Sequence, residues 1–184
     1  ISFAGISETS SNFVLETIKN IDLTYETWVF CKLVEAIEQR FGIKDLDFNT
    51  KNEYVEFVHD GQSIFLVHEK VIPGYDNPQN TPDFAFFKDK IETKNLFCVF
   101  DAKNTPHLIR PQRHVIHSYQ HDLQCAFGGL ISEDEKRKNK EDEESGQKTW
   151  YIKLEFSKEA KESNREQLEK LLEQITKELN DTRL

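Results

Sequence analysis

The sequence lacks methionine altogether, which is unusual for a chain of 184 residues. We therefore expect a fragment of a longer protein, or a sequence from which modified methionines have been omitted. Cysteine is scarce as well: Cys31, Cys98 and Cys125 lie in apolar contexts and form no CxxC pair. This usage is typical of reduced core residues in a cytoplasmic protein. No apolar run approaches the ~18–20 residues of a membrane span, and no signal peptide is present, so we expect no membrane partner.

Positive charge is also in deficit, because 24 Lys and Arg residues face 33 Asp and Glu residues and the net charge is −9. This balance argues against a surface that coats nucleic acid broadly, but it leaves room for local contacts. No GxxxxGK[ST] phosphate loop occurs, so any nucleotide-driven motor must lie on another chain or a missing segment. What is present is 37% hydrophobic residues, including 14 Phe. That content is enough for the core of one domain with appendages.

Two short apolar runs, Phe84–Phe87 and Leu96–Phe100, each border a carboxylate. Asp83 precedes the first run, Asp101 follows the second, and Lys103 comes two residues later. The linker between the runs is polar and charged, which predicts an antiparallel hairpin. Because residues i and i+2 of a strand share a face, Asp101 and Lys103 should project together. The hairpin should also return Asp83 to a place beside Asp101.

Two converging carboxylates repel each other unless a cation lies between them. Hard oxygen ligands of this kind suit Mg²⁺ or Mn²⁺. A lysine beside such an ion can orient a water, or neutralise the charge that grows on a phosphate. The residues therefore predict metal-assisted hydrolysis of a phosphodiester.

A third carboxylate belongs to the helix predicted for Leu23–Phe41, with Thr24 as its N-cap. Glu26 heads the apolar stripe of this helix, where a carboxylate is costly without a partner. The helix dipole also favours a glutamate in the first turn, so both a site role and a purely structural role stay open.

The motifs Pro82-Asp83 and Asp101-Ala102-Lys103 resemble the signature of the PD-(D/E)XK nuclease superfamily. The helix start Tyr25-Glu26-Thr27-Trp28 adds a third similarity, since families of this superfamily often place a glutamate on the first core helix. Together the motifs are most similar to McrC-type nuclease subunits of modification-dependent restriction systems, and to related uncharacterised nuclease-like domains. The resemblance covers roughly residues 23–131.

The resemblance implies an α/β fold with a restriction-endonuclease-like core, a central mixed β-sheet flanked by helices. It implies a Mg²⁺-dependent (or Mn²⁺-dependent) endonuclease that cleaves DNA, from a restriction or defence system. Asp83 and Asp101 would bind the metal with the carbonyl of Ala102, and Glu26 would bind a second ion or a metal-bound water. Lys103 would position the attacking water or stabilise the transition state. Partners would be DNA, a separate NTP-driven motor subunit, or a second copy of the chain.

A helix is predicted from Pro111 to about Phe127, and it carries the one locally basic stretch beside these motifs. We expect part of this helix to contact the DNA backbone, while a solvated polar face is the alternative. The spacing of three histidines also permits a zinc site. Two further polar residues fall where related nucleases carry extra polar side chains. The candidate substrate-binding residues are Arg110, Arg113, His114, His117, Tyr119 and Gln120, and the zinc alternative uses His114, His117 and His121.

The chain divides into four expected parts: an N-terminal extension at 1–22, the nuclease core at 23–131, a charged mobile loop at 132–149, and a C-terminal strand and helix at 150–184. The C-terminal helix should begin after Ser157 or Ser163 and pack an apolar stripe on the sheet.

Three alternatives to DNA cleavage remain at this point. The domain can be an inert nuclease-fold module that binds DNA or protein, or a nuclease specific for RNA or for branched structures. The third alternative is coincidence, in which case Asp83 and Asp101 would lie far apart in the folded chain.

Overall fold

The computed structural model describes residues 4–43, 48–49, 54–68, 72, 81–125, 127–134, 140–141 and 147–181. One mixed sheet dominates the fold, with strand order β1-β2-β3-β4-β5-β6-β8-β7. The elements in chain order are α1 (Ala4–Phe41), β1 (Phe48–Asn49), β2 (Tyr54–His59), β3 (Gln62–His68), β4 (Phe84–Lys88), the 3₁₀ turn η1 (Thr93–Asn95), β5 (Leu96–Lys103), α2 (Arg110–Asp122), β6 (Phe127–Ser132), β7 (Lys140–Glu141), β8 (Lys148–Lys153) and α3 (Lys161–Asp181).

The sheet changes character at β5. Strands β1 to β5 pair antiparallel in succession, whereas β5, β6 and β8 run parallel and β7 closes the edge antiparallel to β8. A parallel pair needs a crossover, and α2 supplies it between β5 and β6. The predicted class, an α/β domain with a central mixed sheet flanked by helices, is therefore confirmed.

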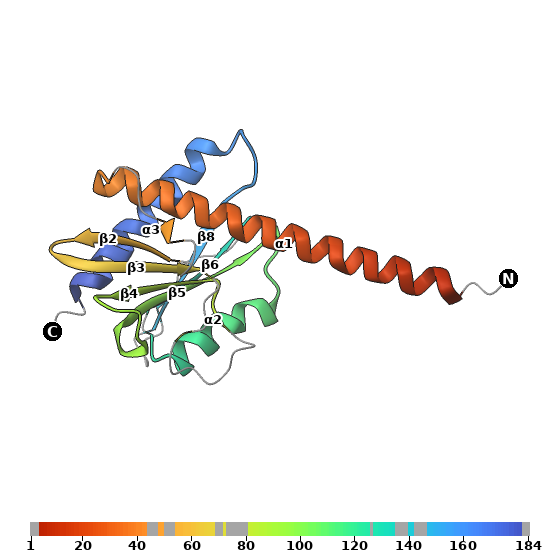
Figure 1. Cartoon of the computed structure of the whole chain (residues 1–184), viewed down its shortest axis with the longest axis horizontal. Helices are drawn as coiled ribbons and strands as arrows, with labels where there is room; N and C mark the ends of the chain where they lie inside the picture. Colours follow the sequence, from red (N-terminus) through yellow and green to blue (C-terminus); the bar gives the residue numbers. More distant parts are fainter. Residues whose placement is uncertain are drawn as a thin grey trace.

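Helices cover both faces of the sheet (Figure 1). Helices α1 and α3 lie on one face, where Phe30 of α1 stacks on Phe84 of β4. Helix α2 lies on the other face, where Ile116 and Gln120 approach the backbone of Gly128 in β6. The N-terminal part of α1 extends beyond the sheet (Figure 1). Within the described residues, no helix has the length and apolar character needed to cross a membrane.

Two hairpins form in the antiparallel part of the sheet, and the second, between β4 and β5, is the one that the apolar runs predict. Asp60 and Gly61 link β2 to β3 with φ values of 49° and 79°, the left-handed pair that an Asp-Gly turn favours. Strands β4 and β5 form the second hairpin, in which Phe84 pairs with Phe100. Every residue from Phe97 to Ala102 is buried, so β5 is the central strand of the core.

Several predicted boundaries are wrong. Helix α1 begins at Ala4, so Thr24 lies inside it and is not an N-cap. Helix α2 ends at Asp122 because Gln124 takes a positive φ of 53°, which turns the chain toward β6 well before Phe127 could continue the helix. Ser163 lies inside α3, and Ser157 instead accepts a hydrogen bond from the N–H of Ala160 just before that helix.

The charged segment predicted as a loop at 132–149 contributes to the sheet at both ends. Ser132 is buried in β6, and Lys148 and Thr149 open β8. Lys148 can enter a strand because Glu178 of α3 pairs with its ammonium at 2.8 Å. The apolar stripe predicted for the C-terminal helix is confirmed: Leu168, Leu171, Leu172, Ile175 and Leu179 are all buried.

Candidate active site at the β4–β5 edge

The hairpin brings together the carboxylates and the ammonium that the sequence predicts. They lie where β4 begins and β5 ends, a place that we call the β4–β5 edge. Asp83 stands one residue before β4, and the register of Phe84 with Phe100 sets it opposite Asp101. The Lys103 Nζ lies 2.7 Å from Asp101 Oδ2 and 3.8 Å from Asp83 Oδ2. One ammonium therefore contacts both carboxylates, and the two oxygens are no farther apart than the sum of those distances. Asp83 and Asp101 therefore lie close together, contrary to the separation expected if the motifs were a coincidence.

A backbone hydrogen bond fixes Asp83. The N–H of Ala102 donates to Asp83 Oδ2 at 2.7 Å. The carboxylate thus takes the place of the backbone carbonyl that would accept this hydrogen bond if β4 began earlier. The N–H and C=O of one strand residue point to the same side, so the Ala102 carbonyl also faces β4. Pro82 stands opposite and has no N–H to donate to it. The PD motif thus anchors the Asp83 carboxylate beside the backbone of β5.

The pKa of Asp83 is raised well above its usual value. Burial is the largest cause, because it disfavours the charged carboxylate, and the negative charges of Asp101 and Glu26 act in the same direction. The Lys103 ammonium and the Ala102 N–H oppose the shift without cancelling it. Burial and the two neighbouring carboxylates therefore disfavour the charged form of Asp83 more than Lys103 and the Ala102 N–H favour it.

Lys103 responds in the opposite sense. Burial alone would lower its pKa, but Asp101, Asp83 and Glu26 together outweigh burial, and the pKa is raised. The ammonium stays protonated at neutral pH. This charge state favours a role as an electrostatic clamp for an anion over a role as a general base.

Glu26 comes to the site from α1. Its neighbour Tyr25 is buried and donates a hydrogen bond to the Leu154 carbonyl at 2.8 Å, which fastens α1 over the end of β8. Glu26 is half-buried, and its charge acts on both Asp83 and Lys103. The carboxylate expected at the head of the apolar stripe thus joins the electrostatics of the site.

The donor set suits a Mg²⁺ ion that keeps several of its waters better than an ion held wholly by protein ligands. Within the described part of the chain, no group of three or more His, Cys, Asp and Glu side chains stands in a metal-holding arrangement. Mg²⁺ does not need one, since it commonly keeps several waters and takes only one or two carboxylates. Asp83 and Asp101 are two such carboxylates, and the Ala102 carbonyl is a third candidate oxygen ligand.

The basic face of α2 is less closely tied to this site. Arg110, His114 and His117 are exposed, and Arg110 Nε donates to His114 Nε2 at 3.0 Å. The His121 ring instead contacts Asp122 at 3.1 Å. The side chain of Arg113 lies outside the described residues. No metal-holding group is found among the described histidines, so the zinc alternative gains no support.

Tyr119 and Gln120, expected near the substrate, face inward. Gln120 is 0% exposed, and its amide donates to the Lys148 carbonyl and accepts from Thr149 Oγ1. Tyr119 is buried and donates to the Thr81 carbonyl at 2.8 Å. Their polar atoms are thus engaged with β8 and with the segment that leads to Asp83. Their hydrogen bonds hold β8 and the segment before Asp83 in place, and the two side chains are not accessible to a substrate.

One residue of this edge escaped the sequence reasoning. Asp134, 5% exposed, follows β6 and accepts a hydrogen bond from the N–H of Leu108 at 2.8 Å. It ties the loop between β5 and α2 to the end of β6, beside Lys103, which pairs with Ser132. The signal was a pair of acidic residues, Glu133 and Asp134, after the buried strand β6, comparable to Asp101 after the apolar run Leu96–Phe100.

No family model, curated protein or solved structure matches this chain, so the resemblance to the PD-(D/E)XK nucleases stays a prediction from the sequence motifs.

Proposed function

We propose that this protein is a divalent-metal-dependent phosphodiesterase that cleaves DNA. The observation that carries the proposal is the contact of one lysine with two carboxylates at the edge of the sheet, Asp101 at 2.7 Å and Asp83 at 3.8 Å. Burial and the nearby Asp101 and Glu26 carboxylates disfavour the charged form of Asp83 and raise its pKa, and a bound cation would stabilise that charged form.

The residues have separable roles in this proposal. Asp83, Asp101 and the Ala102 carbonyl would hold Mg²⁺ or Mn²⁺, which when bound polarises a phosphate and lowers the pKa of a water. The Ala102 N–H keeps Asp83 oriented toward Asp101. Lys103 stays charged and stabilises the negative charge that develops on the phosphate oxygens. Glu26 adds a carboxylate on the α1 side, where it can hold a water by hydrogen bonding.

The wider context belongs to the same proposal. We infer a cytoplasmic nuclease of a restriction or defence system, which works with a motor subunit or a second copy of the chain. A single site cuts one strand, so double-strand cleavage calls for two copies.

An inert module that only binds DNA or protein is the second candidate. It is favoured by the direct contact of Lys103 with Asp101, since an ammonium can balance the carboxylates without any metal ion. Cleavage activity decides between the two candidates.

The experiment incubates the protein with supercoiled plasmid, linear duplex, single-stranded DNA, branched DNA and RNA, in Mg²⁺, Mn²⁺ or EDTA. We expect DNA cleavage with either metal, none in EDTA, and cleavage about 10³-fold slower with Asp101→Asn or Lys103→Ala. Lys94→Gln is the matched control, because Lys94 lies in the β4–β5 connection and its side chain is 76% exposed. Cleavage by Asp101→Asn at the wild-type rate would refute the proposed site, and activity on RNA alone would change the substrate.

A further inference from the structure

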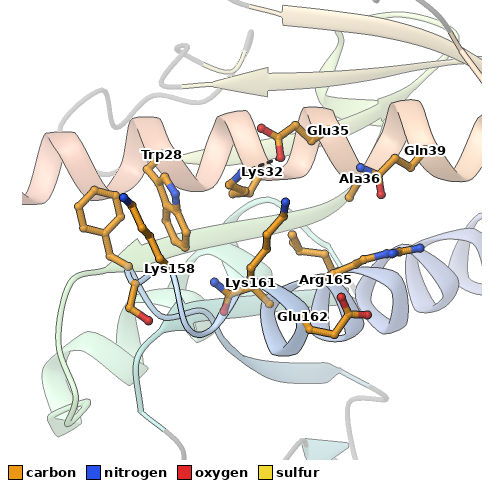
Figure 2. Close-up of a pocket in the computed structure, with 13 residues that line it drawn as sticks. Trp28, Lys32, Glu35, Ala36, Gln39, Lys158, Lys161, Glu162 and Arg165 are labelled. Carbon is orange, nitrogen blue, oxygen red and sulfur yellow. Dashed lines mark hydrogen bonds and ion pairs between the residues drawn. The ribbon is translucent and has the colours of Figure 1, made fainter.

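A groove separates α1 from the start of α3 on the face opposite α2 (Figure 2). Its volume is about 1000 Å³, at the upper end of the range for ligand-binding pockets. The α1 wall carries Trp28, Lys32 and Glu35, and the other wall runs from Phe156 to Leu168. The sequence pattern did not predict this groove.

The end of the groove near Trp28 is aromatic. The rings of Trp28 and Phe156 lie 5.2 Å apart at an interplanar angle of 81°. Phe156 is 56% exposed, one of the few large apolar side chains that the fold leaves open to water. An exposed ring beside an indole offers a flat apolar face, which suits a planar partner such as a nucleobase.

The rest of the groove is positive although the chain as a whole is negative. Four cations line it, Lys32, Lys158, Lys161 and Arg165, against the carboxylates of Glu35 and Glu162. Lys32 is paired with Glu35 at 2.6 Å, and Arg165 with Glu169 at 3.2 Å. In the part of the chain that the structure describes, Lys158 and Lys161 form no ion pair, and Figure 2 shows both extending from the α3 side toward α1. With these two pairs set aside, Lys158 and Lys161 face Glu162 alone, so the groove keeps a local excess of positive charge that suits an anionic ligand.

The aromatic end of the groove lies near the strand ends that carry the candidate active site. Trp28 follows Glu26 by two residues on α1, and the N–H of Phe156 donates to Glu133 directly after β6. The carboxyl ends of β5, β6 and β8 lie at one edge of the sheet because these strands are parallel. The aromatic end of the groove therefore borders the edge that carries Asp101 and Lys103.

We propose that this groove binds a single-stranded nucleic-acid segment, with a base stacked on Phe156 beside Trp28 and backbone phosphates at Lys158 and Lys161. A flat apolar surface and two free cations in one groove match the two chemical parts of an unpaired strand, whereas a duplex hides its bases. The inference rests on the proposed nuclease function for its purpose, since it names a strand the enzyme would hold. Binding itself can be measured without cleavage.

The test uses Trp28 as the reporter. The chain has two tryptophans, so Trp150→Phe leaves Trp28 alone, and a short oligothymidine strand is titrated in EDTA to prevent cutting. We expect saturable quenching of the Trp28 fluorescence. Phe156→Ala should weaken binding about tenfold, within the range for loss of one stacked base. Circular dichroism and thermal melting check that each variant is folded.

A pair of double variants separates the groove from general charge. Lys158→Gln/Lys161→Gln should weaken binding about tenfold and flatten the dependence of log K on log salt by about 0.7 for each lost phosphate contact. Lys170→Gln/Lys177→Gln makes the same change of charge on exposed positions of α3 outside the groove, and it should leave binding unchanged.

Three results would overturn the inference: no quenching, equal losses in the two double variants, or equal affinity for an abasic strand of the same length. Equal affinity for a polyglutamate peptide would assign the groove to an acidic protein partner instead. Oligothymidine binding in the groove without cleavage under any condition would refute the nuclease and leave this inference standing. DNA cleavage that Asp101→Asn strongly reduces, together with no oligothymidine binding in the groove, would support the nuclease and refute this inference.

Discussion

The β4–β5 edge and the α1–α3 groove use charge in opposite ways, and both meet α1. At the edge, two carboxylates are buried around one lysine, and the excess charge is negative. In the groove, cations outnumber carboxylates and lie at the surface beside an exposed ring. Glu26 faces the first region and Trp28 the second, only two residues apart.

Under the proposed function, this difference assigns catalysis to the β4–β5 edge and binding of the nucleic-acid strand to the groove. Burial strengthens electrostatic interactions, so the edge suits one tightly held ion and a reacting phosphate. Exposure keeps charge interactions weak and sensitive to salt, so the groove suits a strand that must be bound and released. An acidic protein can hold nucleic acid in this way, because its positive charge is concentrated locally.

The largest expected effect separates the two regions by catalysis. Asp101→Asn or Lys103→Ala should lower the rate of DNA cleavage by a factor on the order of 10³, because each removes an interaction that supports charge in the transition state. Both variants should still bind oligothymidine as tightly as the wild type. Plasmid nicking and fluorescence titration on the same preparations measure the two effects. If these variants lost oligothymidine binding together with cleavage, the two regions would have to be treated as one site.

Metal binding should belong to the edge alone. Mg²⁺ or Mn²⁺ at about 100 times its dissociation constant should raise the free energy of unfolding by about 2.7 kcal/mol, since it binds only the folded state. Thermal or chemical unfolding with and without the ion measures this gain. Asp83→Asn and Asp101→Asn should abolish it, whereas Lys158→Gln/Lys161→Gln should keep it. A gain that survives in Asp101→Asn would place the ion elsewhere.

The contrast in burial also predicts how Asp83 affects stability. Without divalent ions at neutral pH, Asp83→Asn should raise the free energy of unfolding by about 1 kcal/mol, because it removes a buried charge repelled by Asp101. An asparagine oxygen can still accept from the Ala102 N–H. Urea unfolding of both proteins in EDTA is the measurement. A clear loss of stability would mean that the charged form of Asp83 stabilises the fold.

The sign of the pH dependence follows from the same residue. The folded state raises the pKa of Asp83, so between the unfolded and folded values the folded protein binds more protons. The contribution of Asp83 to stability therefore decreases as pH rises through this window, and it is lowest above the folded pKa. The difference in stability between wild type and Asp83→Asn should accordingly narrow as the pH is lowered toward the unfolded pKa.

The smallest effect concerns the cysteines. Burial raises the pKa of Cys125 to about 12 and also raises the pKa of Cys98, so neither thiol should react in the folded state. Cys31 is exposed on α1. We expect one fast equivalent with a thiol reagent in native buffer and three in denaturant. Two fast equivalents would show that the sheet opens more readily than the structure indicates.

The sequence allowed the β4–β5 hairpin and its site to be predicted because their signals are local. Two apolar runs, a polar linker and a strand period of two suffice to put Asp83, Asp101 and Lys103 together. The Asp60-Gly61 turn was predictable for the same reason. The beginning of α1 was not, because the polar residues before Thr24 match a cap and a continued helix equally well.

The groove and the inward roles of Tyr119 and Gln120 depend on contacts between distant parts of the chain. Phe156 reads as a residue that interrupts a strand pattern, and it gains meaning only beside Trp28. The sequence made Gln120 a candidate substrate-binding residue. Its hydrogen-bond partners are Lys148 and Thr149 of β8, 28 and 29 positions later in the chain. Hydrophobic periodicity carries no information on such pairings.

The most direct test of the account is the anomalous diffraction of crystals soaked in Mn²⁺. The account predicts a peak between Asp83 and Asp101, with metal–oxygen distances of about 2.1–2.2 Å and the Lys103 ammonium moved off Asp101. Crystals that show no such peak at millimolar Mn²⁺, with Lys103 still in contact with both carboxylates, would contradict it.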